Sequence, residues 1–99
     1  MDIKIQSLRF DADGKLLDFV ENKVSKLDQF HDNIIGAEVT LRLDKSESSE
    51  NKVADIKVLI PGSDLFSKKQ AKTFEEATDL ATEALRKQLK RTKEKLKNK

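Results

Sequence analysis

The chain has no cysteine, tryptophan or tyrosine, and only one proline, one histidine and three glycines among its 99 residues. Without cysteine it can form neither disulfides nor thiolate metal sites, which fits a reducing compartment. The N-terminus carries no apolar run long enough for a signal peptide, and no segment is apolar enough to span a bilayer. These absences predict a cytoplasmic protein with no membrane partner.

Groups that could do chemistry are also scarce. His31 is the only histidine, and its place just past the first expected helix predicts a solvent-exposed residue rather than a catalytic base. Asp11 and Asp13 are accounted for by turn formation and helix capping rather than by metal binding. No glycine belongs to a phosphate-cradling loop. We therefore expect no enzyme activity, no catalytic or metal-binding residue, no cofactor and no small-molecule substrate.

Hydrophobic periodicity predicts an α+β fold with the element order β-α-β-β-β-α. Alternating apolar residues predict strands at 2–8, 35–43 and 53–60, and a weaker edge strand at 65–71. A helical period predicts helices from Gly14 to about Asp28 and from Thr73 onward, with Asp13 and Thr73 as the capping residues.

This order of elements also predicts the layers. A β-α-β unit needs a crossover connection, so the strands at 2–8 and 35–43 should be parallel. Two hairpins should follow, the second closed by Pro61 and Gly62. Both helices must bury apolar stripes, so we expect them on one face of a four-stranded sheet, with Ile35 the first inward residue of its strand. Residues 1–99 are expected to form a single domain.

The end of the chain concentrates positive charge. Residues 86–99 hold eight lysines or arginines and one acid, a net charge of +7, whereas residues 1–85 carry −5. On a helix whose buried stripe includes Leu85 and Leu89, the cations fall in rows beside and beyond that stripe. These rows comprise Arg86, Lys87, Lys90, Arg91, Lys93, Lys95 and Lys97. Lys23 and Lys26 line one flank of the first helix. Rows of like charge repel, which favours a polyanion-binding face over a solubilising helix end.

The composition indicates which kind of polyanion the chain could bind. Single-strand binders stack bases on interleaved aromatic residues, and RNA recognition motifs carry aromatics on their central strands. Here the central strands hold valine, isoleucine and leucine. Lysine and arginine can instead contact phosphates with little sequence readout, which predicts folded RNA as the partner and no DNA.

Two stretches carry a resemblance to a known family. LLDFVENKVSKLDQF (residues 16–30) and ATDLATEALRKQLKRTKEKLK (residues 77–97), together with the order of elements, resemble the ribosome hibernation-promoting factors. This family is also called ribosome-associated inhibitors or sigma-54 modulation proteins. The chain as given ends at Lys99, so it resembles the short form of the family.

The resemblance implies a fold akin to the double-stranded-RNA-binding domain and a ribosomal partner. Such proteins bind the 16S-type rRNA of the small ribosomal subunit and overlap the mRNA and tRNA sites, which holds ribosomes inactive in stationary phase or stress. The family's basic positions correspond to Lys26 and to the helical set Arg86, Lys87, Lys90, Arg91, Lys93 and Lys95. With Lys23 and Lys97, these are the expected RNA-binding residues. Two alternatives stay open, a stand-alone duplex-RNA-binding module and a protein-interaction module that binds no RNA.

Overall fold

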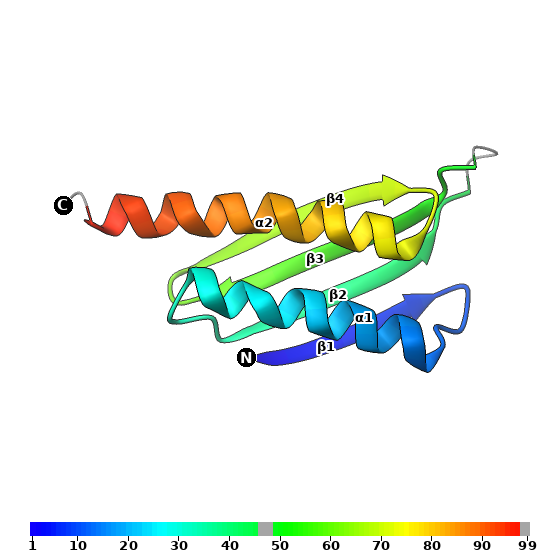
Figure 1. The fold of residues 1–99 in the computed structure, drawn as a ribbon, viewed down its shortest axis with the longest axis horizontal. Helices are drawn as coiled ribbons and strands as arrows, with labels where there is room; N and C mark the ends of the chain where they lie inside the picture. The colour runs from blue at the N-terminus through cyan, green and yellow to red at the C-terminus, as the bar shows by residue number, and fades with distance from the viewer. Residues whose placement is uncertain (46–48, 98–99) are drawn as a thin grey trace.

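A four-stranded sheet covered on one face by two helices forms the protein (Figure 1). The computed structural model describes residues 1–45 and 49–97, with side chains as far as residue 92 in the last helix. The elements are β1 (Asp2–Leu8), α1 (Gly14–Ser25), the 3₁₀ helix η1 (Lys26–Phe30), β2 (Gly36–Leu43), β3 (Lys52–Ile60), β4 (Ser63–Ala71) and α2 (Phe74–Lys97). The predicted α+β class and element order are confirmed.

The sheet has the strand order β1-β2-β3-β4. β1 pairs with β2 in parallel, with Ile5 opposite Val39, as the crossover argument predicted. β3 pairs antiparallel with both β2 and β4. The hairpin between β3 and β4 closes at Pro61 and Gly62, and Gly62 has φ +79°, which the third position of a type II turn requires.

The core lies between the sheet and the helices. Val20 and Val24 of α1 and Leu85 and Leu89 of α2 are fully buried against inward residues of β2 and β3. Burying each leucine completely contributes about 1.5–3 kcal/mol, so these side chains determine which way α2 faces. Both predicted caps are present. Asp13 Oδ1 accepts from Leu16 N at 2.8 Å, and Thr73 Oγ1 accepts from Glu76 N at 3.0 Å.

Three local expectations were wrong, all of them between α1 and β2. The α-helical geometry stops at Ser25, and the chain continues to Phe30 as a tighter 3₁₀ turn. His31 is buried, with 7% of its surface exposed, and its Nδ1 accepts from Asn33 N at 3.1 Å. Ile35 is 60% exposed, whereas Ile34 is buried. The turn that leaves η1 brings His31 and Ile34 inward, so the alternation of buried and more exposed residues in β2 begins only at Ala37.

Candidate nucleic-acid interface

The two helices run side by side in the same direction, and α2 continues past the end of the sheet (Figure 1). Because Leu85 and Leu89 are buried, the intervening residues of α2 project from its remaining surface. Lys87, Lys90 and Arg91 are exposed, and Arg86 is half-buried. The predicted residues Lys93, Lys95 and Lys97 belong to the backbone of α2, but their side chains lie outside the described residues.

One flank of α2 faces α1 and η1 across a shallow cavity of about 180 Å³. Lys23, Lys26, Phe30 and Arg86 contribute to its lining. The Phe30 ring makes cation–π contacts with two residues of α2, because Arg86 Cζ lies 5.7 Å and Lys90 Nζ 5.8 Å from the ring centroid. Such contacts orient long cationic side chains without neutralising them. The ring of Phe30 therefore positions two of the predicted RNA-binding residues.

Two of the predicted cations already have carboxylate partners. Lys23 Nζ lies 2.7 Å from Asp79 Oδ1, which links α1 to α2. Arg86 hydrogen-bonds Glu83, with Nε 3.1 Å from Oε2. That hydrogen bond lowers the pKa of Glu83 and raises the pKa of Arg86, because it stabilises the charged form of each partner. Sequence spacing did not reveal these pairings, and the first one joins residues 56 positions apart.

The remaining predicted cations with described side chains form no ion pair with another described residue. Lys26, Lys87, Lys90 and Arg91 have no described carboxylate oxygen within 4.0 Å. Lys26 is exposed on η1, and the other three follow one another around the outer surface of α2. A row of unpaired cations on a helix that is held rigidly by its buried leucines suits a dense array of phosphates.

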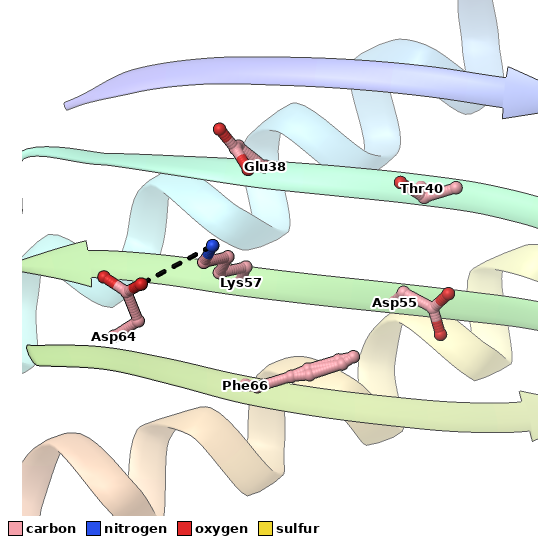
Figure 2. Close-up of a pocket in the computed structure, with 6 residues that line it drawn as sticks. All are labelled: Glu38, Thr40, Asp55, Lys57, Asp64 and Phe66. Atoms are coloured by element: carbon pink, nitrogen blue, oxygen red, sulfur yellow. Dashed lines mark ion pairs between the residues drawn. The ribbon is translucent and has the colours of Figure 1, made fainter.

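The opposite face of the sheet has a different chemistry. A depression of about 410 Å³ there is lined by Glu38, Thr40, Asp55, Lys57, Asp64 and Phe66 (Figure 2). It contains three carboxylates and one lysine, and Lys57 Nζ pairs with Asp64 Oδ2 at 3.5 Å. Phosphates are repelled by such a surface, so the helical side is the better candidate for an RNA interface.

Metal-site and membrane-spanning features are absent from the described part of the chain. Among the described side chains, which end at residue 92, no three of histidine, cysteine, aspartate or glutamate gather as a metal site would require. Across the same part of the chain, no helix is long and apolar enough to cross a membrane.

Comparison with known proteins gives this surface a family context. The family model described as "Sigma 54 modulation protein / S30EA ribosomal protein" matches residues 3–97. The chain belongs to this family. The resemblance found in the two helical stretches is therefore confirmed, and the match spans every helix and strand described above.

Individual members of the family and its fold align along most of the chain. The ribosome hibernation promotion factor of Bacillus subtilis (strain 168) is 31% identical over 101 residues, covering 100% of this chain and 52% of the relative. The chain thus spans about half the length of this curated relative. The crystal structure of the Thermus thermophilus protein Y N-terminal domain superposes with a TM-score of 0.81 at 28% identity, covering 93% of this chain and 99% of that one.

A second solved structure supports the fold alone. A ribosomal subunit interface protein from Coxiella burnetii superposes with a TM-score of 0.83 at 22% identity, covering 94% of this chain and 98% of that one. Both superpositions cover more than nine tenths of this chain, so these two proteins share the fold observed here.

Proposed function

We propose that this chain is a cytoplasmic, non-enzymatic ribosome hibernation factor that binds the 16S-type rRNA of the small ribosomal subunit. Its family membership and the name of its Bacillus subtilis relative support the ribosomal partner. The observation that carries the proposal is the row Lys87, Lys90 and Arg91 on the outer surface of α2, three exposed cations with no ion-pair partner among the described residues. Lys26, and the predicted residues Lys23, Arg86, Lys93, Lys95 and Lys97, extend this surface in the proposal.

The mechanism is occlusion rather than chemistry. A helical layer that is bound to rRNA phosphates occupies space that mRNA and tRNA would otherwise enter, so the ribosome is held inactive. Only affinity and shape are required. If about 5–7 phosphates are neutralised, the logarithm of the association constant should fall with the logarithm of salt concentration at a slope of roughly −4 to −6.

The first test measures co-sedimentation of the full chain with purified small subunits and inhibition of translation in a purified system. We expect the variant Lys87→Glu/Lys90→Glu/Arg91→Glu to lose both activities and to keep its circular dichroism spectrum, because all three side chains are exposed. The matched control is Lys4→Glu/Lys15→Glu/Lys68→Glu, which makes the same charge change at exposed residues away from that row. Equal binding by the two variants would contradict the assignment of this surface of α2 as the RNA-binding surface.

Two further measurements separate this proposal from the alternatives. A stand-alone duplex-RNA-binding module would bind naked RNA duplexes as tightly as it binds small subunits. A protein-interaction module would keep its partners after nuclease treatment of an extract. The hibernation proposal expects a strong preference for the small subunit and a nuclease-sensitive association.

A further inference from the structure

The second flank of α2 faces the edge strand β4 and forms a groove that is distinct from the cavity beside α1. This groove, which we call the α2–β4 groove, has a volume of about 380 Å³. Leu80, Ala84 and Gln88 line it from α2, and Lys69, Lys87 and Arg91 supply cations from both of its sides. Lys69 belongs to β4, which the sequence predicted only as a weak edge strand, and it was not among the residues predicted to bind RNA.

The walls of the groove are held in place. Gln88 Nε2 donates a hydrogen bond to the backbone oxygen of Phe66 at 3.1 Å, which ties α2 to the edge of the sheet. The rotation of α2 is set by Leu85 and Leu89, both fully buried. The separation between Lys69 on β4 and the cations on α2 is therefore built into the fold rather than formed on binding.

The charge in the groove is available to a ligand. Lys69, Lys87 and Arg91 have no described carboxylate oxygen within 4.0 Å. Glu83 is the one acid that lines the groove among the described residues, and its carboxylate is hydrogen-bonded to Arg86. Three cations therefore line a space whose one described acid, Glu83, is hydrogen-bonded to Arg86 and also attracts Lys87 electrostatically. An anion bound there gains attraction from both walls.

The lining between the cations indicates what kind of anion fits. Leu80 is 44% exposed, whereas the other two leucines of α2 with described side chains, Leu85 and Leu89, are fully buried. Leu80 and Ala84 offer an apolar surface between charged rims. A sugar–phosphate backbone presents both chemistries, since its ribose can pack on the apolar surface while its phosphates meet lysine and arginine.

Lys69 could alternatively serve only to keep the edge strand from pairing with another chain. That role would apply equally to its neighbour Lys68. The two lysines point to opposite faces of the sheet, because Lys69 lies opposite the buried Ala54 and Lys68 lies opposite Asp55 of the open face. Only Lys69 lines the groove, so the two explanations make different predictions.

We propose that the α2–β4 groove binds a second segment of RNA backbone, with Lys69 as a phosphate-contacting residue, so that α2 is gripped by phosphates along both flanks. This inference rests on the proposed function. It adds a site on the sheet to an interface otherwise confined to the helices, and it makes α2 a wedge between two RNA segments.

The test compares Lys69→Glu with Lys68→Glu in the full chain, two identical charge changes on adjacent residues. We expect Lys69→Glu to weaken binding to purified small subunits about 5- to 10-fold near 100 mM salt and to flatten the salt slope by about 1. Lys68→Glu should stay within about twofold of the unchanged protein. Lys69→Gln should flatten the slope similarly, which separates loss of a contact from the repulsion that a new carboxylate brings.

Hydroxyl-radical footprinting of the small subunit gives an independent readout. The unchanged protein should protect two RNA segments, and Lys69→Glu should lose protection of one while keeping the other. The groove inference is wrong if the Lys68 and Lys69 variants both bind like the unchanged protein, or if both weaken equally. The proposed function still stands in that case, provided that the triple variant Lys87→Glu/Lys90→Glu/Arg91→Glu fails to bind small subunits. If the unchanged protein does not bind small subunits at all, the groove inference and the proposed function are both wrong.

Discussion

The ammonium group of Lys23 lies 2.7 Å from a carboxylate oxygen of Asp79, so one of the predicted RNA-binding cations joins the two helices. The side chains are 34% and 53% exposed, respectively, and a pair this exposed stabilises a fold by at most about 1 kcal/mol. The Lys23–Asp79 pair is expected to have its larger effect on the proposed binding to RNA. While Asp79 holds Lys23, the carboxylate offsets the charge that Lys23 could offer to a phosphate.

Replacing Asp79 should therefore strengthen RNA binding. We expect Asp79→Asn to raise the affinity for small subunits about two- to fivefold near 100 mM salt and to steepen the salt slope by up to about 1, with little loss of stability. Glu75→Gln is the matched control, because it removes an exposed acid from the first turn of α2, away from the cationic row. An equal gain in both variants would mean that net charge matters and the Lys23 pairing does not.

Phe30 is expected to support binding to small subunits indirectly, by orienting the cationic side chains that contact its ring. Phe30→Leu keeps a partly buried apolar side chain but removes the ring from Arg86 and Lys90. Stability should fall by about 1 kcal/mol, and binding to small subunits should weaken about two- to threefold. The salt slope should not change, since no charge is lost. Phe66→Leu on the open face provides the control, and a comparable binding loss there would contradict the role given to Phe30.

Gly36 is required by a close approach of two backbones. A Cβ at this position would lie 2.7 Å from the carbonyl oxygen of Asp2, on the neighbouring strand β1. Gly36→Ala should destabilise the protein by about 1–3 kcal/mol in chemical denaturation, because neither backbone can move without breaking the parallel pairing. Gly14→Ala meets no atom within 4 Å and should stabilise α1 by up to about 1 kcal/mol. A neutral Gly36→Ala would show that β1 is loosely held.

Much of this fold could be predicted because its signals are local and periodic. The alternation in β2 and β3, the helical spacing of Leu85 and Leu89, and the cap at Asp13 each report on a few neighbouring residues. The burial predictions for His31 and Ile35 were wrong because these residues lie in the connection between η1 and β2. No helical or strand period applies there, and the conformation of the turn determines which side chains enter the core.

The site was less predictable than the fold, because it depends on contacts between elements. Helical spacing gave the positions of Lys87, Lys90 and Arg91 on α2, but it could not show that Asp79 would pair with Lys23. Lys69 was missed for the same reason. Its relation to α2 depends on the place of β4 at the edge of the sheet, which a pattern along one strand does not contain.

The pairing of Glu83 with Arg86 predicts a pH dependence of a definite sign. The hydrogen bond from Arg86 holds the pKa of Glu83 below its ordinary value of 4.5. A carboxyl group whose pKa is depressed on folding stabilises the protein above the unfolded pKa and loses that contribution as the pH falls through the folded pKa. Any stability difference between the unchanged protein and Glu83→Gln should therefore be present near pH 6 and shrink below about pH 4.5.

Carboxyl chemical shifts measured by NMR across an acid titration would check the cause directly. In Arg86→Gln the midpoint for Glu83 should move upward, because both the hydrogen bond and the nearby positive charge are gone. At neutral pH, Glu83→Gln should also bind small subunits more tightly than the unchanged protein, since Arg86 then meets phosphate without competition from a carboxylate. An unchanged Glu83 midpoint in Arg86→Gln would show that the pair is not formed in solution. The half-buried Arg86 would then count with Lys90 among the unpaired cations of α2.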